Sequence, residues 1–188
     1  MPNIHDQQLA ARVSDYQDQE AFAVLHSQYF APIRQFIVFR IDRKEDVEDL
    51  ASQVFLQAWK YLTKIRGRKM ENFRAFLYKV ARNEVADFYR AQGRIPQMVE
   101  LDAPEEYLEI ADTQDDLFQE QIIAQDKDYL IECVNKLPEP YREIIALRYF
   151  EELGIKEIAD IIGKTLGNTN VLIHRGVQTL KKMMKFQS

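Results

Sequence analysis

The sequence has a single cysteine, Cys133, so it can form neither an internal disulfide nor a cysteine-based zinc site. Glycine and proline are also scarce, at six each, and alternating β-branched residues are nearly absent, which disfavours strands and tight hairpins. No stretch reaches the roughly 18 apolar residues that a membrane span needs, and residues 1–13 lack a basic start and an apolar run. We therefore expect an all-α, cytoplasmic protein without membrane insertion.

The residue combinations that catalysis and cofactor binding need are missing as well. The three histidines, His5, His26 and His174, are too scattered in the sequence to suggest a metal site. The chain shows no carboxylate pair, cysteine–histidine pair or glycine-rich phosphate loop. We therefore expect no enzymatic activity, no small-molecule substrate, no cofactor and no metal.

What the chain does have is an uneven distribution of charge. Its net charge is −5, but residues 60–94 carry ten basic and three acidic side chains, whereas residues 99–128 carry one basic and eleven acidic. Because the local field governs contact with a polyanion, the +7 segment is a candidate phosphate-facing patch. An ordinary solvated helix face is the alternative interpretation.

Apolar residues recur at three- and four-residue steps and predict three long helices over residues 20–40, 44–62 and 73–90. A short basic loop, residues 65–72, separates the last two. On the third helix, Phe73, Phe76 and Phe88 belong to the apolar stripe and are expected in the core. The outer side of the second helix aligns four polar residues, Asp46, Asp49, Gln53 and Gln57.

The helices predict two small domains. Residues 1–94 form the first, and residues 95–128 form an acidic linker that opens near Pro96 and loses periodicity. Residues 129–188 form the second, with helices over 137–149, 156–162 and 169–184 and a tight turn at 163–166. A short helix, a glycine-containing turn and a longer helix make a helix-turn-helix.

Two groups of motifs resemble a known family. The runs DVEDL at 46–50, QVFLQAW at 53–59 and FRAFLYKVARN at 73–83 resemble the second conserved region of sigma factors of the extracytoplasmic-function group. The runs LPEPYRE at 137–143, LRYF at 147–150, EIA at 157–159 and HR at 174–175 resemble the fourth region. Both occur in the family's order and flank an acidic linker.

The resemblance implies a non-enzymatic transcription initiation factor that binds core RNA polymerase and promoter DNA, both as duplex and as melted strand. The first domain would dock on polymerase through Asp46, Asp49, Gln53 and Gln57 and open the minus-ten element. The second would read the minus-thirty-five element. The resemblance also implies an anti-sigma partner and association with the nucleoid when the chain is bound to polymerase.

Candidate DNA contacts come from residue chemistry within these regions. In the first domain, cations can follow phosphates while amides receive unstacked bases, and the loop 65–72 resembles the family's loop that cradles a flipped base. The candidates there are Arg66, Arg68, Asn72, Lys79, Arg82 and Asn83. The candidates for the minus-thirty-five element are Lys164, Asn168, Asn170, His174 and Arg175.

The C-terminal domain departs from the family pattern at two places. Asn170, Val171 and Leu172 replace lysine, serine and arginine on the recognition helix. Either Val171 and Leu172 press on thymine methyl groups, or they make a protein contact, with a partner or with the other domain, and the C-terminal domain binds DNA weakly. Gly154 replaces a helix-capping serine, which makes a weaker cap.

Two other functions remain open at this point. A stand-alone helix-turn-helix repressor would leave the polar face of residues 46–57 without a purpose. A pure interaction protein, which binds polymerase or a regulator and reads no DNA, agrees with the departure at the recognition helix.

Overall fold

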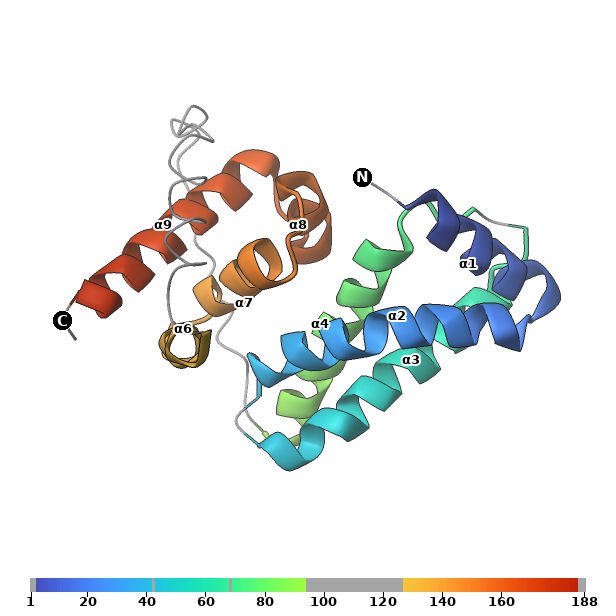
Figure 1. The fold of residues 1–188 in the computed structure, drawn as a ribbon, viewed down its shortest axis with the longest axis horizontal. Coiled ribbons are helices and arrows are strands. Elements are labelled where there is room, and N and C mark those ends of the chain that lie inside the picture. The colour runs from blue at the N-terminus through green and yellow to red at the C-terminus, as the bar shows by residue number, and fades with distance from the viewer. Residues whose placement is uncertain (1–2, 42, 68, 94–126, 186–188) are drawn as a thin grey trace. The chain divides into compact units, whose positions relative to one another are not determined.

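The computed structural model describes residues 3–41, 43–67, 69–93 and 127–185, and within these ranges the regular elements are all helices (Figure 1). This confirms the predicted all-α class. The chain divides into two compact units, Met1–Pro96 and Gln97–Ser188. Most of the predicted acidic linker, residues 95–126, lies outside the described residues, and its last two residues, Lys127 and Asp128, begin a helix.

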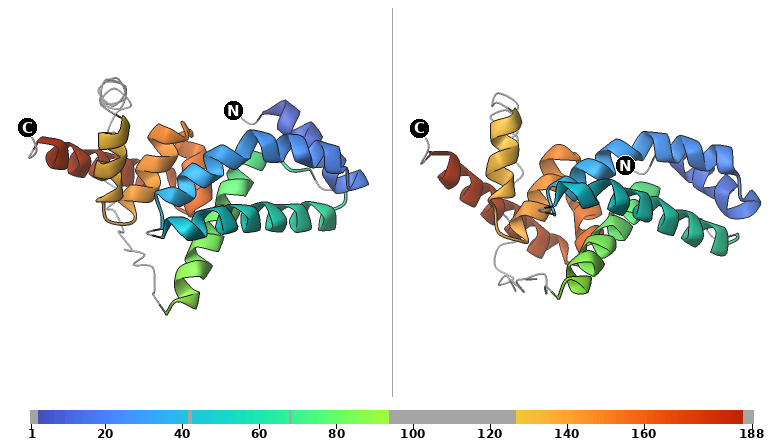
Figure 2. Two further views of the ribbon diagram at one scale, coloured as in Figure 1. Left: turned by 60° about the horizontal axis from the view of Figure 1, so that its bottom comes forward. Right: turned by 90° about the horizontal axis from the view of Figure 1, so that it is seen from below.

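The N-terminal unit contains α1 (Ile4–Tyr16), α2 (Gln19–Val38), α3 (Val47–Lys64) and α4 (Phe73–Ala91), with a 3₁₀ turn, η1 (Lys44–Asp46), before α3. Helices α2 and α3 pack along each other and α4 crosses both (Figures 1 and 2). The helices predicted over residues 20–40, 44–62 and 73–90 therefore exist, with ends that differ by at most three residues.

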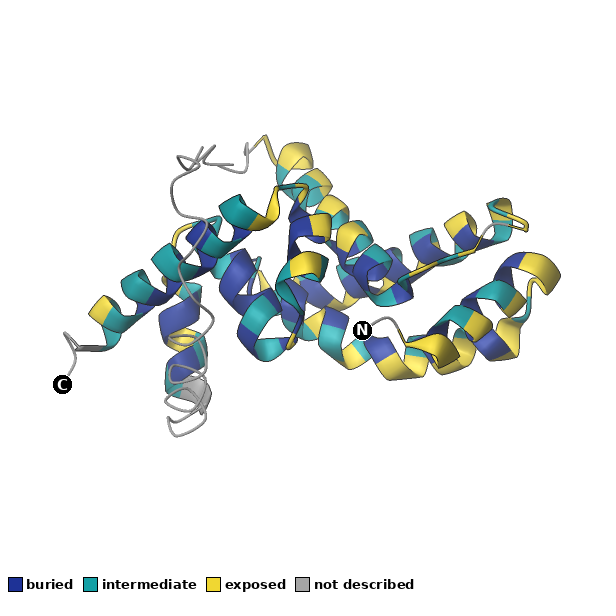
Figure 3. Ribbon diagram, turned by 90° about the horizontal axis from the view of Figure 1, so that it is seen from above, coloured by how far each residue is buried: buried dark blue, intermediate teal, exposed yellow. Residues whose placement is uncertain are grey.

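The core of this unit forms where the apolar stripes of the helices meet. Buried residues recur along each helix at the helical period, with exposed residues between them (Figure 3). Phe36 of α2 and Tyr78 of α4 are fully buried, and their rings meet perpendicularly with centroids 5.4 Å apart. Such edge-to-face pairs add about 0.5–1.5 kcal/mol to the burial of the rings themselves.

Helix α1 was not predicted from the sequence. Its buried apolar residues, Leu9, Ala10 and Val13, cover little more than one turn, so the periodic signal is short. The helix starts at a polar cap, because the side chain of Asn3 accepts a hydrogen bond from the His5 N–H at 3.0 Å. Its burial against α2, α3 and α4 stabilises it more than its own propensity does.

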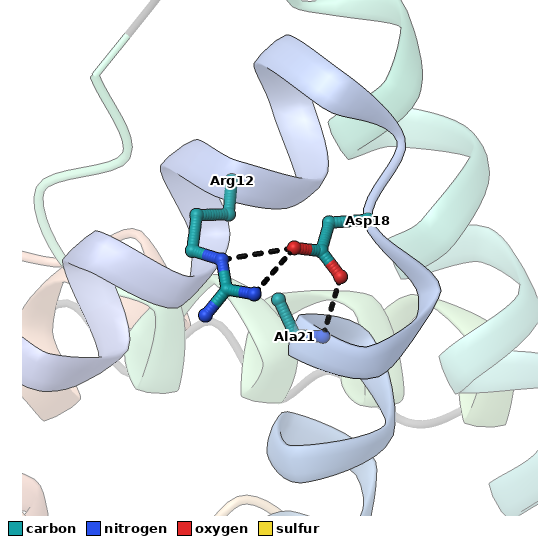
Figure 4. A network of polar contacts seen from close by, with 3 residues as sticks. All are labelled: Arg12, Asp18 and Ala21. Atoms are coloured by element: carbon teal, nitrogen blue, oxygen red, sulfur yellow. Dashed lines mark hydrogen bonds and ion pairs between the residues drawn. The ribbon is translucent and has the colours of Figure 1, made fainter.

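A polar corner fixes the turn from α1 to α2 (Figure 4). Asp18 caps α2 by accepting the Ala21 N–H at 3.0 Å, and Arg12 Nε donates to the same carboxylate at 2.9 Å. The pKa of Asp18 lies below its ordinary value of 3.8. The largest cause is the hydrogen bond from the Ala21 N–H, and the second is the hydrogen bond from Arg12. The preceding residue, Gln17, takes the left-handed conformation with φ 53° and ends α1 by donating to Val13.

The C-terminal unit contains α6 (Lys127–Asn135), α7 (Tyr141–Ile145), a π-helical segment η3 (Ala146–Phe150), α8 (Ile155–Ile162) and α9 (Leu166–Lys185). The helix predicted over 137–149 begins only at Tyr141, because Pro138 and Pro140 disfavour the helical conformation of the residues before them. Helix α9 packs closely on α7 at Gly176, where an added Cβ would lie 3.1 Å from Ile145 Cγ1.

Candidate functional site

The four residues of the predicted polar face lie along α3 or just before it. Asp49 is exposed, whereas Asp46, Gln53 and Gln57 are half-buried. Asp46 lies just before α3 and pairs with Arg43, Nε to Oδ2, at 3.2 Å. Carboxylates at this position also complement the partial positive charge of the helix N-terminus.

Leu56 adds an apolar contact point to this face, which sequence reasoning did not identify. It is 46% exposed and lies three residues after Gln53, beside the polar stripe. A leucine among aligned carboxylates and amides is typical of a surface that another protein covers. The exposed leucine offers apolar area that the partner can bury, and its polar neighbours fix how the two surfaces align. A lone exposed leucine would not indicate this without the stripe beside it.

The outer face of α4 presents Lys79 and Asn83, both exposed and one turn apart, with Arg82 half-buried next to them. Half-buried Phe76 lies on the same face, seven residues before Asn83. Its ring meets that of Tyr61, which is 46% exposed at the end of α3, with centroids 4.7 Å apart. An aromatic pair beside a cation and an amide offers both stacking and base-edge contacts.

The expectation that Phe73, Phe76 and Phe88 all lie in the core was therefore only partly right. Phe73 is buried, but Phe76 and Phe88 are half-buried. The inward stripe of α4 runs through Phe73, Leu77, Ala81 and Val85. Phe76 is rotated to the flank of that stripe, and Phe88 lies beyond its last residue.

The loop between α3 and α4 exposes Arg66 and Lys69. Arg68, predicted to contact DNA, lies outside the described residues. Asn72 caps α4, because its Oδ1 accepts the Ala75 N–H at 2.9 Å. The capping bond gives Asn72 a structural role in addition to any contact with DNA.

The predicted helix-turn-helix is formed by α8, a turn at 163–165, and α9. Gly163 ends α8 in the left-handed conformation with φ 69°, and its N–H donates to Ala159 at 2.9 Å. Thr165 Oγ1 accepts the Asn168 N–H at 3.2 Å and so caps α9. Leu166, Asn170 and His174 follow one another by a turn on one face of α9, where Leu166 is exposed and the other two are half-buried. Half-buried residues flank them: Lys164, Asn168 and Arg175.

Both roles considered for Val171 and Leu172 were wrong. These side chains are only 5% and 2% exposed, so they face neither DNA nor a partner but lie in the core. Helix α9 packs against α6, α7 and α8, which requires a wide apolar stripe. The exposed apolar residue of the recognition helix is instead Leu166, at 52%.

Neither a membrane span nor a metal site was found in the described parts of the chain. No helix there is long and apolar enough to cross a membrane. The same residues contain no group of three or more histidine, cysteine, aspartate or glutamate side chains that could hold a metal ion.

Two family models match the chain. Sigma-70 region 2 matches residues 25–95, and Sigma-70, region 4 matches residues 127–180. Together these matches cover most of α2 and all of α3 and α4 in the N-terminal unit, and α6 to most of α9 in the C-terminal unit.

Similar proteins extend the match along most of the chain. The ECF RNA polymerase sigma factor SigW of Bacillus subtilis is 29% identical over 182 residues, which cover 89% of this chain and 91% of SigW. The ECF RNA polymerase sigma-E factor of Escherichia coli is 28% identical over 183 residues, covering 93% and 92%.

Two solved structures share the fold. CnrH in complex with the cytosolic domain of CnrY has a TM-score of 0.70 at 22% identity, covering 98% of this chain and 99% of that one. The sigma factor RpoE in complex with the anti-sigma factor NepR from Bartonella quintana has a TM-score of 0.62 at 20% identity, covering 87% and 96%.

Proposed function

Because this chain belongs to the sigma-70 family, in its extracytoplasmic-function group, we propose specific surfaces for its contacts with polymerase and with promoter DNA. The chain directs promoter-specific transcription initiation without enzymatic chemistry. The N-terminal unit docks on core RNA polymerase and stabilises the melted minus-ten element. The C-terminal unit reads the minus-thirty-five element. The chain acts in the bacterial cytoplasm, at the nucleoid when bound to polymerase.

The docking surface is the outer face of α3, formed by Asp46, Asp49, Gln53, Gln57 and Leu56. The single observation that supports this proposal is the alignment of carboxylates, amides and an exposed leucine along one helix face. Charge complementarity on such a face steers the encounter with a basic helical partner and fixes the register of docking. The partner surface is therefore a basic one on polymerase.

The minus-ten surface is the outer face of α4 with the end of α3. Lys79, Arg82 and Arg66 follow phosphates, while Asn83 and the Tyr61–Phe76 ring pair receive unstacked bases. The strand is held without a covalent step, so melting is a binding reaction. Each base contact that forms only after strand separation shifts the equilibrium toward the open promoter.

The minus-thirty-five surface is the N-terminal half of α9. Asn170 can make a bidentate contact to adenine, and Leu166 can contact a thymine methyl group in the major groove. Lys164, Asn168, His174 and Arg175 flank this face and contact phosphates or bases. This arrangement favours an A/T-containing site.

An anti-sigma factor is a further partner. CnrH and RpoE, which share this fold, were both solved in complexes, and RpoE is bound there to an anti-sigma factor. The same exposed α3 face would suit a regulator that competes with polymerase.

Charge reversal on α3 tests the docking surface. We expect Asp49→Arg to reduce affinity for core polymerase by about tenfold or more, because it places a cation against a basic partner. The matched control is Glu48→Arg, which makes the same charge change in the same helical turn but on another face, where Glu48 pairs with Arg34.

Affinity for core polymerase and promoter-specific transcripts are measured for both variants, with helical content as a check on folding. Loss of the exposed Arg34–Glu48 pair changes stability by only about 0–1 kcal/mol, and repulsion between Arg34 and the introduced arginine is of similar size because both are exposed, so the control should fold and bind. Equal loss of affinity in the two variants, or none in Asp49→Arg, would contradict this docking face.

A further inference from the structure

We propose that α1 is a positioning element for the loop 65–72, and that Asp15 and Gln7 set the loop conformation that meets the melted strand. The inference rests on the proposed minus-ten surface. Asp15 Oδ1 accepts the Gly67 N–H at 3.1 Å, and Gln7 Nε2 donates to the Glu71 carbonyl oxygen at 2.6 Å. These bonds join residues 52 and 64 positions apart and hold the loop at two points.

Among the described residues of the loop, Gly67 is one that packing does not hold in place. Gly67 has φ 73° and nothing within 4 Å of the position a Cβ would take, so packing does not restrain it. Arg66 and Lys69 are exposed and carry like charge, which favours separation over a compact turn. The hydrogen bonds from Asp15 and Gln7 therefore restrain the loop at Gly67 and Glu71 from outside it.

Helix α1 is itself held in place by contacts with the rest of the unit, so its hydrogen bonds can fix the position of the loop 65–72. Asp6 is buried, at 2% exposure, and accepts hydrogen bonds from the Tyr29 hydroxyl and from Gln28 Nε2, the latter at 3.2 Å. The Arg12–Asp18 corner ties the other end of α1 to the start of α2. The loop is thereby linked through α1 to the core of the unit.

A role for Asp15 as a charge alone is the competing explanation. An exposed carboxylate near Arg66 and Lys69 could simply weaken the local positive field. Asp15→Asn separates the two roles, since it removes the charge but keeps an oxygen that accepts the Gly67 N–H. Asp15→Ala removes both. Neither change should unfold α1, because an acidic residue in the last turn of a helix opposes the helix dipole.

The experiment uses the full chain with core polymerase and measures promoter opening by permanganate reactivity of thymines. We expect Asp15→Ala to reduce opening about fivefold, as loss of one ordinary hydrogen bond would, with affinity for core polymerase unchanged. Asp15→Asn should open nearly as well as the original chain. Gln7→Glu, isosteric but without the donor, should reduce opening as Asp15→Ala does.

A second readout measures the loop directly. Amide hydrogen exchange at Gly67 should speed up in Asp15→Ala and stay slow in Asp15→Asn. The control is Glu20→Ala, which removes an exposed carboxylate from α2 and should change neither the exchange rate nor promoter opening. Unchanged opening in Asp15→Ala, or equal loss in Asp15→Asn, would overturn the positioning role.

The comparison variant Asn83→Ala separates this inference from the proposed surface. If Asn83→Ala reduces opening and Asp15→Ala does not, the positioning role is overturned while the minus-ten surface stands. If both variants and Arg66→Ala open the promoter normally, the surface and the inference are overturned together.

Discussion

We expect Asn170 to carry most of the base recognition by α9, because this half-buried amide lies one turn after the exposed Leu166 and one turn before His174 on the same face. We expect Asn170→Ala to relax the choice of base at one upstream position and to cost about 1–3 kcal/mol there, with little change on other sequences. The measurement is affinity for a set of promoters with single substitutions in the minus-thirty-five element. A uniform loss across all sequences would instead assign Asn170 to phosphate contact.

Tyr29 gives a pH dependence that can be separated from that of other groups. The pKa of Tyr29 is raised above its ordinary value of 10.0. Burial of the hydroxyl is the largest cause, and the hydrogen bond that it donates to Asp6 is the second. The folded state therefore keeps a proton that the unfolded state loses above about pH 10. The stabilisation is fully present below this pH and declines as pH rises through the alkaline range.

Tyr29→Phe tests this linkage. At pH 8 the variant should be less stable by about 1–3 kcal/mol, because Asp6 loses a hydrogen bond in a buried site. Between pH 10 and 11 the original chain should lose about 1 kcal/mol more than the variant. Urea unfolding at the three pH values measures both effects, and parallel pH curves for the two proteins would rule out the assignment to Tyr29.

At the scale of single elements, the start of α8 can be improved. Gly154 is extended, with φ −68° and ψ 151°, and its N–H donates to Glu157 Oε2 at 3.2 Å. Having no side chain, glycine supplies only this half of a reciprocal cap. An added Cβ would lie 3.5 Å from Glu157 Oε2, an ordinary contact, so a serine fits.

We expect Gly154→Ser to raise the free energy of unfolding of the C-terminal unit by about 0.5–1 kcal/mol, through the hydroxyl cap and a less flexible unfolded chain. Gly154→Ala is the control, since alanine also makes the unfolded chain less flexible but has no hydroxyl to cap the helix. Thermal unfolding measures both. If alanine stabilises as much as serine, the hydroxyl makes no cap.

The strongly periodic helices were predictable and the weakly periodic ones were not. Helix α2 places apolar residues at every turn from Leu25 to Ile37, which defines one face without knowledge of its neighbours. Helix α1 has a short stripe and depends on polar contacts to distant residues, such as Asp6 with Tyr29. Hydrogen bonds between residues far apart in sequence leave no local pattern.

The candidate site followed the same division. Periodicity was enough to predict that Asp49, Lys79 and Asn83 point outward, because spacing along one helix determines a face. The Tyr61–Phe76 pair depends on where α4 crosses α3, which no spacing reveals. Val171 and Leu172 were misassigned because the width of the buried stripe on α9 depends on how many helices pack against it.

At the scale of the whole molecule, charge is separated along the chain. Residues 60–94 have a net charge of +7, and residues 99–128 have −10. An acidic segment that is covalently joined to a DNA-binding surface stays close to that surface and so lowers its attraction for a polyanion. Salt screens this effect. The free chain should therefore bind single-stranded DNA less tightly than its basic segment would by itself.

Replacing the nine acidic residues between 100 and 120 by their amides tests this effect in the full chain. We expect affinity for single-stranded DNA to rise by roughly tenfold at low salt, with the difference shrinking as the Debye length falls below about 5 Å at high salt. A control with the same residues in permuted order keeps the charge and should bind like the original chain. A permuted chain that binds as tightly as the amide variant would indicate that the order of these residues, rather than their charge, weakens binding.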